Sequence, residues 1–328
     1  MGKLEVVIPV AGVGKRLRPH TYSMPKALIH VAGKPILGHI LDEVESLRPS
    51  KVVLVVGHAA SMIKEYVKKK RNSVYKFVHQ PQPKGIGHAV SLAGQELSGG
   101  PLLIILGDTI FKTDLKRVIS KRKNAIGVKR VSDPSRFGVV EVQGGRIRRV
   151  IEKPKRPTSN LAIVGIYYIE DSRVLLEELD RLVSSGKSTK GEFQFTDGLA
   201  GMVKRGLRLG TFKVEGWYDC GTVKATLDAN VSLLELSGGN RRRFKDSVVL
   251  KPSYVDRSAT ILRSVIGPHT TVAKGAVIID SAVRSSIVEA GARIENTILE
   301  RSLVGRAARI EGKAASVNAS ELSKLSYL

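Results

Sequence analysis

The 328-residue sequence has a single cysteine, Cys220, and no apolar run that approaches the length of a membrane span. One cysteine excludes an internal disulfide and is typical of proteins in a reducing compartment. The N-terminal stretch is interrupted by Pro9 and lacks a basic leader followed by a small-residue cleavage site. We therefore expect a cytoplasmic protein that does not span a membrane.

Aromatic residues make up only 5% of the chain, and acidic residues are outnumbered, with 30 Asp and Glu against 54 Lys and Arg and a net charge of +24. Such an excess of positive charge raises the hypothesis of nucleic-acid binding. The basic residues are spread along the chain, however, with short concentrations at 68–71, 121–130 and 241–245, and no aromatics alternate with them to stack bases. We therefore expect a solvated basic surface that attracts nucleotides and other anions, and we do not expect nucleic acid as a partner.

Hydrophobic residues account for 42% of the sequence, which is enough for the packed core of one large or two ordinary domains. In the N-terminal part, short β-branched runs at 4–8 and 51–56 alternate with helical patterns at 36–47 and 61–71. This alternation predicts a doubly wound, Rossmann-like α/β domain with a mixed sheet. Ligands of such a domain bind beyond the carboxyl ends of the strands.

The first predicted strand runs into a glycine loop, in which Ala11, Gly12 and Gly14 leave little side chain where the backbone turns. Backbone N–H groups in such a loop point readily at an anion, and phosphate is the obvious candidate. A tight turn between a strand and a helix would use the same glycines, so the loop alone does not decide between the two interpretations. Fixed positive charges follow at Lys15, Arg16, Arg18 and Lys26. A polyphosphate cradle is therefore the first hypothesis for this loop.

Two common phosphate-binding signatures do not fit the loop. A P-loop places Ser or Thr after Gly-Lys, but here Arg16 follows, and a dinucleotide fingerprint needs a third glycine where Leu17 stands. The remaining pattern is Gly-x-Gly-x-Arg-Leu-x-Pro-x-Thr, with Pro-Lys four positions later. It resembles the signature of the sugar-1-phosphate nucleotidylyltransferases, and the sequence VAGKPI at 31–36 continues the match.

This resemblance implies a nucleoside triphosphate and a sugar-1-phosphate as substrates and Mg²⁺ as cofactor. It assigns nucleotide binding to the glycine loop, through Ala11, Gly12 and Gly14. It assigns catalysis to two of the cations, Arg16 and Lys26. The chain departs from the family pattern at Lys15, which replaces a threonine, at Ala27 and His30, which replace prolines, and at Ile86, where threonine is frequent.

A second loop, at 80–89, contains two prolines and two glycines before a predicted helix. Its first residue, Gln80, presents both an amide donor and an acceptor, which complement the imide edge of thymine or uracil. Taken alone, Gln80 is an ordinary loop amide. The resemblance extends to Gly85 and to His88, and it implies that Gln80 reads the base while the Gly85 backbone contacts the nucleotide.

A third candidate position, Asp108, directly follows the buried apolar run at 101–106. An aspartate just beyond a central strand lies where open α/β sheets bind ligands, although it also serves as a helix cap elsewhere. The resemblance implies that Asp108 is a Mg²⁺ ligand, and hard oxygen ligands suit a metal that bridges nucleotide phosphates. It supplies a second ligand, Asp219, from the sequence WYDCGT at 217–222.

The sugar side of the implied site comes from the middle of the chain. A strand at 137–142 contains Gly138, and a glycine pair at 144–145 predicts a hairpin turn. Glu152 and Lys153 follow, which as an isolated pair would be a solvated surface feature. The resemblance implies sugar-phosphate binding by Gly138, Glu152, Lys153 and Gly165, with the segment 191–197 in support.

A different periodicity begins after the glycine-rich, basic stretch SGGNRRRFK at 237–245. Aliphatic residues recur every five or six positions, at Val255, Ile261, Ile266, Val272, Ile278, Val283, Val288, Ile294, Leu299, Val304 and Ile310. Two positions before each of them stands Ser, Thr or Ala. Neither a helix nor a simple strand explains this interval. The pattern resembles the hexapeptide-repeat left-handed β-helix, with coils of about 16 or 17 residues.

We therefore predict a catalytic domain at 1–236, a linker at 237–252, a left-handed β-helix at 253–312 and a tail of unknown role at 313–328. The combined resemblance favours dTTP and glucose-1-phosphate as substrates, and it implies a homo-oligomer formed through the β-helix. UTP-glucose-1-phosphate uridylyltransferase and mannose-1-phosphate guanylyltransferase activities are the alternatives within the family. A hexapeptide-repeat acyltransferase is the alternative from another class, for which His269 would be the candidate base.

Overall fold

The computed structural model describes residues 3–68, 70, 73–186, 188–189, 191–312, 318–321 and 324–326. Its contacts divide the chain into two compact units, each of which combines two segments. The first unit consists of Met1–Val13 and Ile40–Trp217, and the second of Gly14–His39 and Tyr218–Leu328. None of the helices formed by the described residues has the length and apolar character that crossing a bilayer requires.

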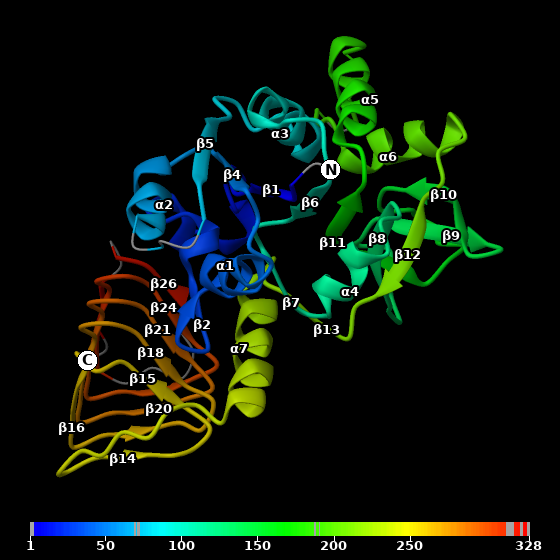
Figure 1. Ribbon diagram of the computed structural model, residues 1–328. Helices are drawn as coiled ribbons and strands as arrows, with labels where there is room; N and C mark the ends of the chain where they lie inside the picture. The colour runs from blue at the N-terminus through cyan, green and yellow to red at the C-terminus, as the bar shows by residue number, and fades with distance from the viewer. Residues whose placement is uncertain are drawn as a thin grey trace. The chain divides into compact units, whose positions relative to one another are not determined.

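A nine-stranded mixed sheet forms the centre of the first unit (Figure 1). The order along its main path is β10-β9-β11-β6-β1-β4-β5, and β8 joins β11 to β12. β1 pairs in parallel with both β4 and β6, whereas β11 runs antiparallel to β6. The strands are β1 (Glu5–Pro9), β4 (Lys51–Val56), β5 (Tyr75–His79), β6 (Leu102–Ile105), β8 (Ala125–Arg130), β9 (Val139–Gln143), β10 (Arg146–Ile151), β11 (Leu161–Ile169) and β12 (Gly210–Lys213). The predicted doubly wound, mixed α/β sheet is confirmed.

Helices connect and cover these strands. They are α1 (Ile36–Ser46), α2 (Ala60–Val67), α3 (Ile86–Ala93), α4 (Leu115–Ser120), α5 (Ser172–Ser184) and α6 (Phe195–Lys204). One apolar core joins α3, α5 and α6 to the sheet, through residues such as Val90, Leu179 and Leu199 against Ile104 and Tyr167. Its strands are apolar on both faces near β1, as expected for parallel strands buried under helices.

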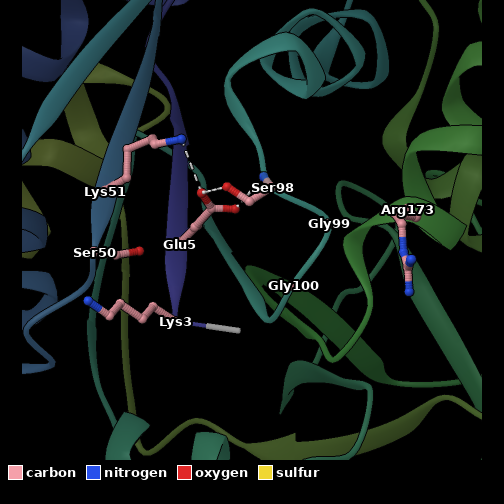
Figure 2. A pocket seen from close by; sticks show the side chains of 8 residues that line it. All are labelled: Lys3, Glu5, Ser50, Lys51, Ser98, Gly99, Gly100 and Arg173. Atoms are coloured by element: carbon pink, nitrogen blue, oxygen red, sulfur yellow. Dashed lines mark hydrogen bonds and ion pairs between the residues drawn. The ribbon is translucent and has the colours of Figure 1, made fainter. Parts of the chain in front are cut away.

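A buried carboxylate, that of Glu5, lies at the amino end of β1. Glu5 is only 3% exposed, and its oxygens accept hydrogen bonds from Ser98 N at 2.9 Å and Ser98 Oγ at 3.0 Å. Lys51 Nζ lies 3.2 Å from the same carboxylate. Figure 2 shows this cluster on one wall of a cavity of about 550 Å³, with Arg173 standing apart on the other side. Because Glu5, Ser98 and Lys51 satisfy one another, we interpret this cluster as structural.

Replacement of Glu5 by alanine is expected to lower the free energy of unfolding by about 2–3 kcal/mol, because it leaves the Ser98 donors and Lys51 without their buried acceptor. Urea titration followed by circular dichroism measures the change. The matched control is Lys3→Ala, because Lys3 is exposed and lines the same cavity, and we expect a change within about 0.5 kcal/mol. Equal effects of the two substitutions would contradict a structural role for Glu5.

Parallel strands stacked in three sheets form a β-helix in the second unit, drawn from yellow to red in Figure 1. The first sheet contains β14 (Val248–Val249), β17 (Val265–Ile266), β20 (Ala282–Arg284) and β23 (Ile298–Glu300). The second contains β15 (Tyr254–Val255), β18 (Thr271–Val272), β21 (Ile287–Val288), β24 (Leu303–Val304) and β26 (Asn318–Ala319). The third contains β16 (Thr260–Leu262), β19 (Val277–Ile279), β22 (Arg293–Glu295), β25 (Arg309–Glu311) and β27 (Lys324–Ser326).

Both sequence positions that predicted the β-helix are confirmed. The recurring aliphatic residues are at most 3% exposed and the small residues that precede them at most 7%. The small positions that carry hydroxyls also link successive coils. Ser281 N donates to Ser264 Oγ at 3.1 Å, and Thr297 N donates to Ser281 Oγ at 3.1 Å. A larger side chain at these positions would remove such hydrogen bonds and would not fit the corner.

Strands extend beyond the predicted limits of the β-helix at both ends. β14 lies inside the segment predicted as a linker, and β26 and β27 lie inside the predicted tail, of which 313–317, 322–323 and 327–328 are outside the described residues. Before β14, helix α7 (Val223–Ser237) leads into the β-helix. Asn230 of α7 donates through Nδ2 to the His269 carbonyl at 2.9 Å and accepts from Ala32 N at 2.8 Å.

The segment 14–39 is anchored within the second unit by a buried ion pair. It contains three short 3₁₀ turns (Lys15–Leu17, His20–Tyr22 and Lys26–Leu28) and the hairpin β2 (His30–Val31) and β3 (Lys34–Pro35). Glu289 is 1% exposed and accepts from His30 N and from His30 Nδ1, each at 2.7 Å. His30 thus replaces the proline of the family pattern with a residue that has a specific partner in the β-helix.

Each partner shifts the pKa of the other. Burial lowers the pKa of His30, but the Glu289 carboxylate and, more weakly, Asp256 outweigh it, so the pKa is raised above 6.5. Burial raises the pKa of Glu289, but His30 outweighs it and holds that pKa below 4.5. The histidine therefore contributes stability below its unfolded pKa and loses it as the pH rises through its raised pKa. The carboxylate contributes stability above its unfolded pKa and loses it as the pH falls.

We expect the difference in free energy of unfolding between the wild type and His30→Gln to be largest at roughly pH 4.5–6.5 and to shrink toward pH 8. Urea titrations of both proteins at pH 5, 6, 7 and 8 give this difference. The variant leaves Glu289 buried without its cation, so it is the less stable protein at pH 6. A difference that stays constant from pH 5 to pH 8 would contradict the charged pair.

Candidate functional site

Near the carboxyl end of β1, two glycines pack tightly against neighbouring atoms, whereas a third glycine faces open space. A Cβ on Gly107 would lie 2.4 Å from Val10 Cγ1, and one on Gly57 would lie 2.9 Å from the Ala11 carbonyl oxygen. Packing therefore requires glycine at both positions. Gly12 is exposed, and a Cβ there would meet nothing within 4 Å. Because the fold leaves this space open, Gly12 suits the close approach of a ligand to the backbone.

In the second unit, one compact loop holds the two predicted catalytic cations. Gly14 has φ +65°, and its Cβ would lie 3.2 Å from Lys26 Cβ, so the chain at Gly14 touches the chain at Lys26. Thr21 Oγ1 donates to the Gly14 carbonyl at 2.9 Å and fixes the turn. Leu17 is fully buried and anchors the turn Lys15–Leu17, while the Arg16 side chain is exposed.

The two other cations of this loop differ in their surroundings. The Arg18 guanidinium lies over the Tyr22 ring at 4.8 Å from its centroid, which is a cation–π contact. Lys15 is exposed beside Arg16, and the described residues supply neither of them with a carboxylate partner. Lys15 and Arg16 are thus directed into solvent, where an anionic ligand is accessible to them.

Gln80 is held in place by the loop that follows it. Its side chain is 5% exposed, and Nε2 donates to the Gly85 carbonyl at 3.1 Å and contacts His88 Nδ1 at 2.9 Å. Burial and Lys84 lower the pKa of His88, which favours the neutral ring that accepts at Nδ1. Both amide hydrogens of Gln80 are then used within the protein. What Gln80 offers a base in this arrangement is its carbonyl oxygen, an acceptor for an imide N–H.

Gly85 is required by the backbone. It has φ +97°, and a Cβ would lie 2.7 Å from the Phe193 carbonyl oxygen. Gly87 N donates to that same oxygen at 2.9 Å, so the start of α3 is fixed against the segment 191–197. The segment 191–197 thus helps to hold the loop at 80–89, and its predicted support of the sugar side stays a prediction.

The structure brings three of the four predicted sugar-binding residues together. A Cβ on Gly138 would lie 3.2 Å from Glu152 Oε2 and 3.0 Å from Thr196 Cγ2. Thr196 Oγ1 donates to Glu152 Oε2 at 3.0 Å, and Lys153 Nζ lies 2.9 Å from Glu152 Oε1. Lys153 is half exposed and has φ +40°. The pair is therefore not a fully solvated surface feature, because its carboxylate is built into the unit.

Gly165 has a backbone role close to Leu106. It has φ +92°, its Cβ would lie 2.9 Å from Leu106 Cδ1, and its carbonyl accepts from Leu106 N at 2.9 Å. The register between β11 and β8 shifts between Ile163 and Tyr167, so Gly165 lies at an irregularity of β11. Irregular positions of this kind re-aim neighbouring side chains.

Tyr167 is a buried residue between the predicted sugar-binding cluster and Asp108, and it was not singled out from the sequence. Its side chain is 3% exposed, and its ring meets Phe195 edge to face at 4.7 Å. Burial, and then the carboxylates of Glu152 and Asp108, raise its pKa far above 10. Both carboxylates therefore act on one buried phenol. Thr196 was likewise not singled out, because a threonine carries no recognisable signal before its partner Glu152 is known.

The predicted metal ligands offer hard oxygens in small numbers. Asp108 follows β6, before β7 (Thr109–Lys112), and Asp219 ends β13 (Gly216–Asp219). Asp219 Oδ1 accepts from Gly221 N at 3.0 Å, and a Cβ on Gly221 would lie 3.0 Å from that oxygen, so glycine keeps the carboxylate accessible. No group of three or more potential ligands occurs among the described residues. Each carboxylate by itself is a donor that fits Mg²⁺, which binds one or two carboxylates and completes its shell with water and substrate phosphates.

His269, the candidate base for acyl transfer, is engaged in the fold. Its Nε2 contacts the Glu235 carboxylate of α7, and its carbonyl accepts from Asn230. Its side chain is 22% exposed. The residue therefore joins α7 to the β-helix.

Comparison with known proteins agrees with these features. The family model described as nucleotidyl transferase matches residues 5–235. The glucose-1-phosphate thymidylyltransferase of Streptomyces antibioticus is 30% identical over 346 residues, covering 96% of each chain. The bifunctional protein GlmU of Methanocaldococcus jannaschii is 33% identical over 264 residues, which are 79% of this chain and 61% of that protein. The chain thus spans less than two thirds of the length of this archaeal relative.

A solved structure supports the fold. The crystal structure of a UDP-glucose pyrophosphorylase complexed with UDP-glucose superposes with a TM-score of 0.63 at 25% identity. The superposition covers 72% of this chain and all of that chain.

Proposed function

The chain belongs to the nucleotidyl transferase family, and from this premise we propose that it joins a nucleoside triphosphate to a sugar-1-phosphate and releases pyrophosphate. The observation that carries the proposal is the open space at Gly12. Packing explains the glycines at positions 57 and 107, but it does not explain Gly12. The exposed cations that follow Gly12 suit a triphosphate. The cluster of Gly138, Glu152 and Thr196 suits a sugar, because it combines a bare backbone with fixed acceptors.

In the proposed reaction, a phosphate oxygen of the sugar-1-phosphate attacks the α-phosphorus in line. The new P–O bond forms as the bond to the β-phosphate oxygen breaks, and pyrophosphate leaves with that electron pair. Arg16 and Lys26 stabilise the charge that develops on the phosphates, and Lys153 orients the incoming phosphate. Asp108 and Asp219 would hold Mg²⁺, which when bound neutralises phosphate charge.

For the substrates we propose dTTP and glucose-1-phosphate, with UTP as the close alternative. The Gln80 carbonyl oxygen accepts from the imide N–H that thymine and uracil share, so this contact does not separate them. Guanine also has a ring N–H but adds an amino group, and GTP with mannose-1-phosphate is the third candidate. The name of the Streptomyces antibioticus relative, which aligns over nearly the whole chain, supports the first choice.

A substrate panel tests the proposal. The four triphosphates dTTP, UTP, GTP and ATP are each combined with glucose-, mannose- and N-acetylglucosamine-1-phosphate in the presence of Mg²⁺, and pyrophosphate is measured. We expect release with dTTP and glucose-1-phosphate to exceed that of the other pairs, with UTP second. Release with none of the pairs would contradict the proposal, and activity confined to acetyl-CoA would favour the acyltransferase.

We also propose that two copies of the chain associate through one face of the β-helix. Val248, Val265, Ala282 and Ile298 follow each other in register on the outer side of neighbouring strands. Val248, Val265 and Ile298 are 53%, 41% and 68% exposed. An aligned apolar row of this kind is typical of an interaction surface.

The charges beside this row favour a second copy as the occupant. Arg263 pairs with Asp280 at 2.7 Å, and Arg284 pairs with Glu300 at 2.6 Å, so these four charges beside the row neutralise each other although the chain carries +24. An apolar face bordered by paired charges is where two copies of a strongly cationic chain meet with little repulsion. We expect Ile298→Glu to lower the mass measured by light scattering to that of a monomer, and Ile298→Val to leave it unchanged. A wild-type monomer would contradict the association.

A further inference from the structure

A cationic groove of about 870 Å³ runs along β10 and α6 of the first unit. β10 is the last strand on its side of the main sheet path, so the groove lies at a sheet edge. Its cations are Arg146, Arg148, Arg149, Lys204 and Arg208, and its one acid is Asp197. All five cations are exposed. None of the residues predicted to bind nucleotide, sugar phosphate or metal lines this groove.

A β-bulge explains how one strand presents so much charge. The register between β10 and β9 shifts between Ile147 and Arg149. Without the bulge, Ile147 and Val150 would point to opposite faces of the sheet. With it, both are buried in the core, while Arg148 and Arg149 are both exposed. The extra residue therefore adds a cation to the groove without disturbing the core.

Most of this charge is not neutralised within the protein. Arg149 lies 3.7 Å from Glu141, which is a weak pair at a largely exposed position. Across the part of the chain that the structure describes, no carboxylate pairs with Arg146, Arg148, Lys204 or Arg208. Asp197 accepts from Thr189 Oγ1 at 3.3 Å, and burial and then Glu152 raise its pKa. The single acid thus offsets little of the positive charge.

The residues that line the groove also indicate which kind of anion it can bind. Between the cations the walls are aliphatic, with partly exposed residues such as Ile151, Val203 and Leu207, and no aromatic residue lines the groove. A surface that binds single-stranded nucleic acid usually offers aromatic rings for base stacking, and this groove has none. Its volume is within the range of pockets that hold one small molecule.

We propose that the β10–α6 groove binds a small molecule that carries two or more phosphate groups on an aliphatic or sugar frame. Arginine side chains grip phosphate oxygens with paired N–H donors, and four unpaired cations suit at least two such groups. The aliphatic walls accommodate the frame between the phosphates. This site accounts for part of the positive charge that the proposed catalytic reaction does not use, and it does not depend on that reaction.

Lysine protection in the full-length protein tests the proposal. The probe is inorganic tripolyphosphate, and the readout is the rate at which an amine-reactive reagent modifies Lys204, measured by mass spectrometry. At a probe concentration ten times its Kd, we expect the rate at Lys204 to fall about tenfold by mass action. Lys116, exposed on α4 and outside the groove, serves as the internal reference and should keep its rate.

The variant Arg148→Glu with Arg208→Glu should lose the protection of Lys204. The matched control, Arg306→Glu with Arg309→Glu, makes the same charge change on exposed residues of the second unit and should keep it. Persistent protection in the groove variant would overturn the proposal, as would a Lys204 no more protected than Lys116. Stronger protection by oligo-dT at equal phosphate concentration would also overturn it, in favour of nucleic acid. Pyrophosphate release is unaffected by any of these outcomes, so the catalytic proposal stands or falls separately.

Discussion

Replacement of Arg16 by alanine is expected to lower kcat for pyrophosphate release by about 10³. In the proposed reaction, negative charge shifts onto the leaving pyrophosphate as the bond to the α-phosphorus breaks. A guanidinium fixed beside the phosphates stabilises that charge more in the transition state than in the ground state. Arg16 is exposed on a turn anchored by the buried Leu17, so its removal should not unfold the chain. Steady-state kinetics with dTTP and glucose-1-phosphate measure the effect.

Arg18→Ala is the matched control for this prediction. It removes the same charge from the same loop, but the Arg18 guanidinium lies over the Tyr22 ring. We expect kcat to change by no more than about threefold, because general loop charge contributes little once screened by salt. Equal losses in the two variants would indicate that only the overall charge of the loop matters, and this would contradict a specific role for Arg16.

Asp108→Asn is expected to lower kcat/KM by at least about 10² and to raise the Mg²⁺ concentration needed for half-maximal activity. The amide keeps the size of the side chain but loses the charge that a hard cation prefers. Steady-state kinetics at increasing Mg²⁺ concentration measure both effects.

The control for the carboxylate is Asp114→Asn, six residues further along. Asp114 caps α4 by accepting from Arg117 N at 3.0 Å, and it is exposed. The variant should lose about 1 kcal/mol of stability at most and keep the wild-type dependence on Mg²⁺. An unchanged Mg²⁺ dependence in Asp108→Asn, with full activity, would exclude Asp108 as a ligand.

Features that depend on local sequence were predictable. The β-helix followed from two linked positions, because an inward aliphatic and a small corner residue repeat with each strand of the coil. The glycine loop after β1 was predictable as well, since only a few backbone arrangements use Gly-x-Gly directly after a buried strand. The resemblance then supplied roles for Gly138 and Glu152, and the structure places these two residues together.

Features that depend on distant partners were not predictable. His30 and Glu289 are separated by 259 residues, and each looks like a surface residue in its own segment. Gln80 donates its amide hydrogens to the Gly85 carbonyl and to the His88 ring. The spacing of Gln80 and His88 in the sequence does not reveal where that ring lies. The bulge between Ile147 and Arg149 is also invisible in sequence, because consecutive arginines predict only an exposed segment.

Because His30 binds Glu289, the number of β-helix coils that precede Glu289 cannot change without breaking this pair. Thr271 pairs with Ile287, 16 residues later, so deletion of 271–286 would keep every inward position in phase. The shortened β-helix should fold, because each coil contacts only its neighbours. Glu289, however, would move back by one strand spacing, about 4.8 Å, and would leave His30 without its carboxylate. A change in coil number after Glu289 therefore leaves the His30 pair in place, whereas a change before it does not.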